Sequence, residues 1–269
     1  MTYKVGFIGG GNMAGALISG IISKGLFHKD EIIASAASEK TVRALNQKYE
    51  IASTLSNIDV VQNSEIVILA VKPYMIFKVI QEISPFLAQD QVVISIASGI
   101  TLEKLSKAMP HQKIYRAMPN TPAAVNLGMT SLCTRLSELE PSRKSVTEIF
   151  NAIGKTAWID ESLMHAAIAV HGSSPAYAYI MIEAMADAAV LEGMPRDKAY
   201  LMAAQALLGA AQMVLTTGLH PGVLKDQVTS PGGNTIAAIA VLEQDGFRSS
   251  IIRAMKAAAD KSREMESSS

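Results

Sequence analysis

The chain has 269 residues, 49% hydrophobic and 18% charged, so it can bury a large core and does not have the composition of a disordered chain. Its 24 basic and 24 acidic residues cancel, which argues against partners that depend on bulk charge, namely nucleic acid and anionic membrane surfaces. The single cysteine, Cys133, excludes an internal disulfide, and no Cys or His pair has zinc-site spacing. We therefore expect no metal site and a reducing, cytoplasmic compartment.

The first half alternates strand-length apolar runs with segments of helical period. The strand-length runs are KVGFIG, EIIASA, SEIVILAVK, QVVISIAS and KIYRAMP. Residues 12–24 and 40–49 repeat apolar side chains at helical spacing. This alternation predicts right-handed βαβ units and a parallel sheet, that is, a Rossmann-type α/β domain over residues 1–160.

The first strand runs directly into a glycine-rich loop, GGGNMA, which begins at Gly9. This is the G-x-G-x-x-A variant of the dinucleotide fingerprint, placed after a strand and before a helix. Gly9 would permit a tight turn, Gly11 a close approach to pyrophosphate, and Ala14 close packing of helix on strand. The alternative is an ordinary glycine-rich turn between a strand and a helix.

The second strand ends without the acid that usually accepts hydrogen bonds from the ribose 2′-OH of NADH. Alanine and serine occupy residues 34–38, and Lys40 follows. A 2′-phosphate would meet hydroxyls and a cation there, so we predict NADPH, with NADH used less well. The alternative is that Glu39 turns inward and selects NADH.

Two later strands end in segments suited to the rim of a ligand site. Ala70-Val71-Lys72-Pro73 stops one strand, and residues 96–99 stop the next. Ligands of open α/β sheets bind outside the carboxyl ends of the strands, so we expect Lys72 to contact nicotinamide or ribose. The alternative is that Lys72 is an ordinary solvated lysine.

The second half, residues 161–269, predicts an all-α domain with helices at 175–192, 196–217, 235–244 and 248–266. These helices are apolar around most of their circumference, as in YLMAAQALLGAAQMVL, which is more apolar surface than a lone bundle buries. We therefore predict a homodimer through these helices; the alternative is that the N-terminal domain covers them. The uncharged stretch at residues 199–224 is long enough for a membrane span, but polar residues, glycine and proline interrupt it, so we expect a buried soluble helix.

A second glycine-rich turn, PGGN at residues 231–234, precedes the helix that starts near Thr235. Such a turn leaves backbone N–H groups unpaired, which favours an anion such as a carboxylate. Thr235 adds a hydroxyl at the same point. The alternative is that Thr235 only caps its own helix.

The chain resembles the pyrroline-5-carboxylate reductase family over nearly its whole length. The matching pieces include GFIGGGNMA, AVKP, IASGIT, RAMPNTPA, SSPAYAYIMIEAMADAAVLEGMPR and HPGVLKDQVTSPGGNTI, and LKDQVTSPGGNTIAAIAVLE covers the family's signature stretch. The resemblance implies an N-terminal Rossmann domain and a helical C-terminal domain that exchanges helices in a dimer, with larger rings of dimers in the family. It also implies NADPH-dependent reduction of 1-pyrroline-5-carboxylate to L-proline, the last step of proline biosynthesis.

The same resemblance implies roles for individual residues. Those expected at the pyrophosphate are Gly9, Gly11, Asn12 and Met13. Ser35 and its neighbours are expected at the 2′-phosphate, and Asn57 at the adenosine. Those expected around the nicotinamide are Ala70, Val71, Lys72, Pro73, Ala97 and Asn120. Those expected at the substrate carboxylate and ring nitrogen are Ser230, Gly233, Asn234 and Thr235.

The chain departs from the family pattern at two points. HGSSP, starting at His171, replaces the commoner SGSGP, and Asn234 stands in a variable position of the signature. We expect His171 to be structural, because no partner ligand is visible near it.

A protonated C=N is already electrophilic, so positioning accounts for much of the catalysis. Thr235 is expected to hydrogen-bond the ring nitrogen, and Lys72 is expected to be the second catalytic residue.

Two other functions fit parts of the pattern. A β-hydroxyacid dehydrogenase or a broader imine reductase would share the two-domain plan. A β-hydroxyacid dehydrogenase would carry a catalytic lysine within a helix of the second domain, where the long helices offer only Lys198. A nucleotide-sensing scaffold without turnover would bind NADPH but would not oxidise it.

Overall fold

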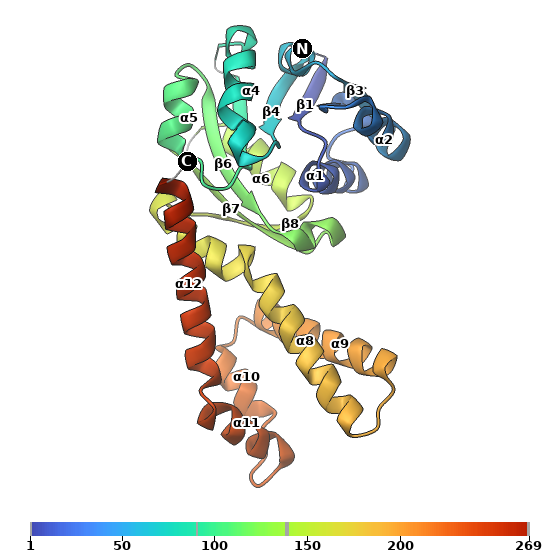
Figure 1. Ribbon diagram of the computed structural model, residues 1–269, viewed down its shortest axis with the longest axis vertical. Helices are drawn as coiled ribbons and strands as arrows, with labels where there is room; N and C mark the ends of the chain where they lie inside the picture. The colour runs from blue at the N-terminus through green and yellow to red at the C-terminus, as the bar shows by residue number, and fades with distance from the viewer. Residues whose placement is uncertain (1, 90, 138–139, 268–269) are drawn as a thin grey trace. The chain divides into compact units, whose positions relative to one another are not determined.

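A computed structural model describes residues 2–89, 91–137 and 140–267. The chain divides into two compact units. The first comprises the described residues up to Gly172 together with those from Ala258 onward. The second is Ser173–Ala257. Figure 1 shows a sheet flanked by helices in the first unit, whereas the second consists of helices.

The first unit is built on an eight-stranded sheet with strand order β3-β2-β1-β4-β5-β6-β7-β8. All neighbouring strands are parallel except β6 and β7, which are antiparallel. The strands are β1 (Tyr3–Ile8), β2 (Ile32–Ser35), β3 (Ala52–Thr54), β4 (Ser64–Leu69), β5 (Val92–Ser95), β6 (Lys113–Pro119), β7 (Gly128–Thr134) and β8 (Gly154–Trp158). The predicted Rossmann-type sheet is confirmed, and β3, β7 and β8 add to the predicted strands.

The register of the sheet brings several strand ends to one edge. Ile8, the last residue of β1, pairs with both Ser35 of β2 and Leu69 of β4. Leu69 in turn pairs with Ser95 of β5. Because these strands are parallel, the loops that leave them lie beside one another, where ligands of open α/β sheets bind.

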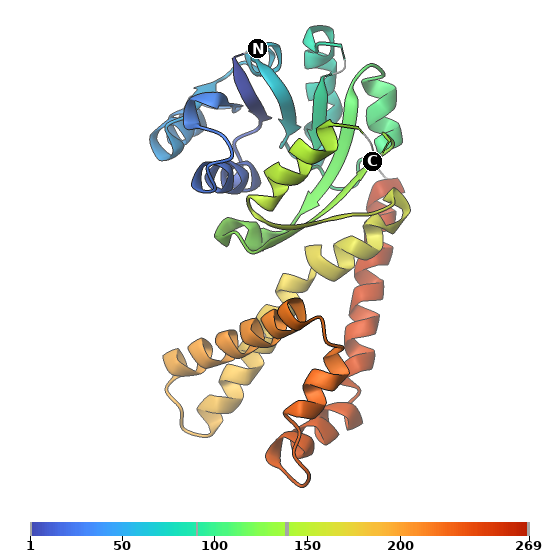
Figure 2. The ribbon, with the colours of Figure 1, turned by 180° about the vertical axis from the view of Figure 1, so that it is seen from behind.

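Helices cover both faces of the sheet, as Figures 1 and 2 show from opposite sides. They are α1 (Asn12–Ser23), α2 (Glu39–Tyr49), α3 (Asn57–Asn63), α4 (Ile76–Ile83), α5 (Leu102–Ala108), α6 (Ser142–Asn151) and α7 (Met164–Ala167). Successive side chains of β1 belong to different cores: Phe7 lies in the cluster that contains Leu17 of α1, and Ile8 lies in the cluster that contains Val79 of α4. This alternation follows from the two-residue period of a strand and buries β1 from both sides.

The second unit contains α8 (Ser174–Leu191), α9 (Arg196–Thr217), α10 (Pro221–Gln227), α11 (Asn234–Gln244) and the start of α12 (Phe247–Ser267). The four predicted helices are confirmed, with ends that differ by one residue at most, and α10 is additional. The last turns of α12, from Ala258 onward, belong to the first unit.

Helices α8 and α9 pack together but leave many large apolar side chains exposed on the single chain. Ile180 is 65% exposed, Leu201 71% and Leu215 73%. Among the described helices, α9 alone is long and apolar enough to cross a membrane by length and composition, with 11% of its apolar window buried. The single chain leaves most of this helix exposed because it is apolar around most of its circumference and α8 covers only part of its surface; the predicted burial within a homodimer stays a prediction.

The two compact units do not divide at residue 160, where the sequence placed the domain boundary. Residues 161–172 belong with the sheet, and Met164 is fully buried there. Asn120 at the end of β6 donates from Nδ2 to the carbonyl oxygen of His171 at 2.8 Å. These contacts account for the later division, at Gly172.

His171 is buried in a short π-helical segment, Ile168–Gly172. Its Nε2 lies 2.7 Å from the hydroxyl oxygen of Ser131, and its Nδ1 has no hydrogen-bond partner among the described residues. Burial lowers the pKa of His171 below its usual value of 6.5. These are the contacts of a structural histidine that is neutral in the folded chain.

The folded chain should lose stability as the pH falls below about 6.5, because His171 then binds a proton more readily in the unfolded chain than in the folded one. Urea unfolding at pH 7.5 and 5.5 measures this loss. His171→Asn should reduce the loss, whereas the same change at the exposed His111 should not. Equal losses in wild type and His171→Asn would contradict the assignment.

Candidate active site

Gly9 occupies a backbone conformation that only glycine adopts easily. Its φ is +107°, and a Cβ atom at this position would lie 2.7 Å from the carbonyl oxygen of Ala70. Its N–H donates to the carbonyl oxygen of Ser35 at 3.1 Å. Gly9 therefore lets the loop after β1 pass between the ends of β2 and β4.

The presence of glycine at position 11 has a different explanation. Its φ of −78° suits any residue, and a Cβ atom there would meet nothing within 4 Å. Gly11 is the N-cap of α1, yet no side chain of the described chain caps this helix, so first-turn N–H groups remain for an anion. The protein's own packing does not require glycine at this position, so the open space fits a pyrophosphate. Met13 lies in the same first turn.

The loop is accessible from one further side. Gly10, Gly11 and Asn12 line a hollow of about 390 Å³ between α1 and α2. Gly11 and Asn12 are both exposed.

The segment after β4 forms the neighbouring part of the rim. Ala70 N–H donates to the carbonyl oxygen of Ile8 at 2.8 Å, which ties this segment to the glycine loop. Lys72 precedes the short 3₁₀ helix Pro73–Met75 and is exposed. Its ammonium group has no ion pair or hydrogen bond with the described residues, so it can serve a ligand at this edge. Val71 is partly exposed beside it.

Ser35 does not lie where a direct contact with the 2′-phosphate would require. It is fully buried, and its hydroxyl donates to Oδ1 of Asn57 at 2.7 Å. The reason is that its side chain lies against α3, which packs on β2 and begins at Asn57. Asn57 in turn donates from Nδ2 to Glu82 at 3.0 Å. Glu82 was not predicted, since an exposed glutamate of α4 carries no sequence signal.

The exposed polar groups after β2 lie a few residues further on. Ser38 caps α2 by accepting a hydrogen bond from the N–H of Thr41, and Lys40 is exposed. Glu39 accepts a hydrogen bond from Arg43 at 2.8 Å on the surface of α2. Its carboxylate is thus paired along its own helix, which does not favour the inward-turned Glu39 that would select NADH.

Ala97 and Asn120 occupy the remaining strand ends, and both are buried. Ala97 follows β5, and its N–H donates to the Ser95 hydroxyl at 3.3 Å. Asn120 follows β6, and its side-chain amide makes two hydrogen bonds within the protein: Oδ1 accepts from the N–H of Met129 at 2.8 Å, and Nδ2 donates to the carbonyl oxygen of His171. The Asn120 side chain therefore holds backbone segments in place, a role that the sequence did not reveal.

The expected substrate end is the turn before α11. Gly232 has a φ of +69°, and the N–H of Gly233 donates to the carbonyl oxygen of Ser230 at 3.1 Å. Gly233 is the N-cap of α11 and has an extended backbone, and within the described chain no side chain caps this helix. The start of α11 therefore offers free N–H groups to an anion, as the start of α1 does.

Thr235 is the second residue of α11, not its N-cap. Its hydroxyl lies 3.4 Å from Oδ1 of Asn234, a long contact that leaves it available to a ligand. The simpler alternative, in which Thr235 caps its own helix, is therefore wrong.

The residues expected at the sheet edge and those expected at α11 belong to different compact units. Among the described residues, no group of three or more His, Cys, Asp or Glu could hold a metal ion.

Two family models match the chain. One is described as pyrroline-5-carboxylate reductase dimerisation and matches residues 161–265, which begins at the predicted domain boundary. The other is described as NADP oxidoreductase, coenzyme F420-dependent, and matches residues 4–99, which span the glycine loop and the rim.

Known proteins match the chain from end to end. A pyrroline-5-carboxylate reductase of Escherichia coli (strain K12) is 47% identical over 269 residues, which is 100% of both chains. A solved pyrroline-5-carboxylate reductase of Coxiella burnetii is 34% identical with a TM-score of 0.92, covering 98% of this chain and 99% of its own. A solved pyrroline carboxylate reductase of Plasmodium falciparum with NADP bound is 32% identical with a TM-score of 0.87, covering 98% of each chain. The resemblance seen in the signature stretch is thus confirmed, and the chain belongs to the pyrroline-5-carboxylate reductase family.

Proposed function

We propose that this chain reduces 1-pyrroline-5-carboxylate to L-proline with NADPH, the last step of proline biosynthesis. The proposal rests on two helices, α1 and α11, each of which follows a glycine-rich turn and has no side-chain cap among the described residues. The chain that carries them matches pyrroline-5-carboxylate reductases over its full length. The start of α1 suits a pyrophosphate, and the start of α11 suits a carboxylate.

Several features support NADPH as the cofactor. Gly11 leaves open space beside free N–H groups, and the residues after β2 include no acid directed at a ribose. Lys40 is exposed near the expected 2′-phosphate. The contacts there would come from the surface after β2, since Ser35 is buried and acts through Asn57.

NADPH, when bound, supplies a hydride to the carbon of the protonated imine, which becomes the secondary amine of proline. The residues of the chain hold the reactants. Free N–H groups of α11, with Ser230, bind the carboxylate, and the Thr235 hydroxyl hydrogen-bonds the ring nitrogen. Lys72 contacts the cofactor from the rim of the sheet.

The second unit also supports a homodimer. The dimerisation model matches residues 161–265, and α8 and α9 expose the apolar side chains that such an interface would bury. A second copy of the chain is the occupant that fits this surface. A larger ring of dimers and a cytoplasmic location remain our proposals.

Adding 1-pyrroline-5-carboxylate to the chain and NADPH should cause loss of NADPH absorbance. The kcat/KM should be roughly tenfold higher with NADPH than with NADH, a difference of about 1.4 kcal/mol. 1-Pyrroline, which lacks the carboxylate, is the matched control and should react poorly. NADPH binding without oxidation would favour a sensing scaffold, and a preference for NADH would end the cofactor assignment.

Gly11→Ala should weaken NADPH binding about tenfold or more while changing the free energy of unfolding by less than about 1 kcal/mol, because its Cβ would meet only the ligand. Gly9→Ala should instead destabilise the fold by about 1–3 kcal/mol, because of its positive φ and its contact with Ala70. Binding titrations and urea unfolding separate the two effects. Unchanged NADPH affinity in Gly11→Ala would argue against a pyrophosphate at this loop.

Thr235→Ala should lower kcat/KM roughly 10- to 100-fold, the range expected for a hydrogen bond to a charged group. Thr235→Ser keeps the hydroxyl and should recover most of the activity. NADPH affinity should stay the same in both variants, since Thr235 belongs to the substrate end. An unchanged kcat/KM in Thr235→Ala would refute its role.

A further inference from the structure

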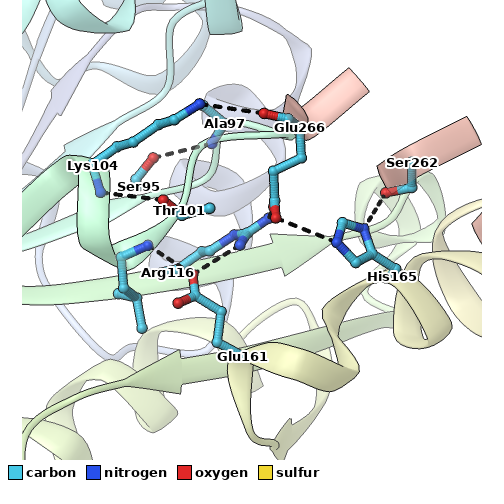
Figure 3. A network of polar contacts seen from close by, with 10 residues as sticks. Ser95, Ala97, Thr101, Lys104, Arg116, Glu161, His165, Ser262 and Glu266 are labelled. Atoms are coloured by element: carbon cyan, nitrogen blue, oxygen red, sulfur yellow. Dashed lines mark hydrogen bonds and ion pairs between the residues drawn. The ribbon is translucent and has the colours of Figure 1, made fainter. Parts of the chain in front are cut away.

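Arg116, in the interior of the sheet, carries a charge that the proposed reaction does not use. Its side chain is 1% exposed on β6. Nη1 donates to Glu161 at 2.9 Å, and Nη2 donates to Glu266 at 3.1 Å (Figure 3). A guanidinium group is always charged and can bridge two carboxylates at once, which a lysine cannot do with the same geometry. Arg116 therefore joins two segments that lie far apart in the sequence.

Glu161 extends the bridge to α5. Its Oε1 accepts a hydrogen bond from the backbone N–H of Leu102, the first residue of that helix, at 2.7 Å. One carboxylate oxygen thus receives both a guanidinium and a backbone N–H. Glu161 begins the segment of the first unit that leads to the second unit at Gly172.

Glu266 is held by three separate elements of the first unit. Its Oε1 lies 3.3 Å from Nε2 of His165, and its backbone oxygen accepts from Nζ of Lys104 at 3.3 Å. Nδ1 of His165 lies 2.9 Å from the hydroxyl of Ser262, one turn earlier on α12 (Figure 3). The last turns of α12 are therefore fixed to β6, α5 and α7 by polar contacts.

We call Arg116, Glu161, His165, Ser262 and Glu266 the cluster. Its contacts matter because of where these residues lie along the chain. The chain passes between the two compact units twice, after Gly172 and after Ala257. Glu161 and His165 precede the first passage, whereas Ser262 and Glu266 follow the second. Arg116 therefore fixes both connecting segments onto the sheet of the first unit, and α12 is one continuous helix across the second passage.

We propose that Arg116 and Glu266 are positioning residues of the reductase, which act on turnover by holding the two connecting segments on the sheet of the first unit. Neither residue belongs to the glycine loop or to the turn before α11, where the reactants are proposed to bind. This inference rests on the proposed function, which places the cofactor on the first unit and the substrate on the second. Hydride transfer is sensitive to small misplacements of the reacting atoms, so a loosened connection acts on kcat.

The test compares Glu266→Gln and Arg116→Lys with Glu103→Gln in the full-length chain. Glu103 lies on α5 near the cluster, and among the described residues its carboxylate pairs with Lys107 on the surface. In both cluster variants, kcat should fall roughly tenfold. This loss is smaller than the about 100-fold loss that a 1 Å misplacement of the reacting atoms can cause. KM and Kd for NADPH should stay within about twofold of wild type, because the glycine loop is untouched. Backbone hydrogen exchange in residues 258–267 should become faster.

Glu103→Gln should match wild type in all of these measurements. If kcat in Glu266→Gln equals that of the control, the positioning role is overturned, whether or not exchange rises. A raised KM for NADPH with unchanged kcat also overturns it, because the cluster would then serve cofactor binding. Glu266→Gln decides the matter alone if Arg116→Lys does not fold, since Glu266 is partly exposed. A wild type that never oxidises NADPH with 1-pyrroline-5-carboxylate refutes the proposed function itself, whereas an active wild type with an unaffected Glu266→Gln refutes only the positioning role.

Discussion

The close approach of the loop after β1 to the end of β4 is the constraint on which the first unit's site depends. Gly9 reaches it with a positive φ and with its missing side chain facing the carbonyl of Ala70. Because Ile8 is paired on both sides, the loop has one course, and it delivers Gly11 to the free start of α1. The rim residues after β4 then lie beside the loop because their strand is in register with β1.

In the proposed site, backbone groups supply most of the anion-binding capacity. Helices α1 and α11 each begin at a glycine without a side-chain cap, and each follows a turn that needs a glycine with positive φ, Gly9 or Gly232. Free N–H groups at a helix start carry partial positive charge without a titrating side chain. The proposed binding of a dinucleotide and a carboxylate at two local sites therefore needs no net charge on the chain.

Arg116 shows the opposite use of charge. A buried guanidinium is costly unless carboxylates and hydrogen bonds surround it; Glu161 and Glu266 pair with its two Nη atoms, while its Nε has no hydrogen-bond partner among the described residues. Replacing such a cluster with apolar residues is often neutral for stability, so stability alone does not explain its presence. The geometry it defines is the attachment of the connecting segments to the sheet.

The sequence by itself determined the Rossmann sheet, the helical second half, the glycine loop and the family, because strand and helix periods and glycine spacing are local properties of the chain. Short or partly exposed strands such as β3 and β8 lack the continuous apolar run of a buried strand, so they were not predicted. Tertiary structure alone decided that Ser35 faces inward to Asn57 and that the amide of Asn120 is used within the protein. It also brought Arg116 to carboxylates 45 and 150 residues away, since no local pattern records which distant side chains packing will place together.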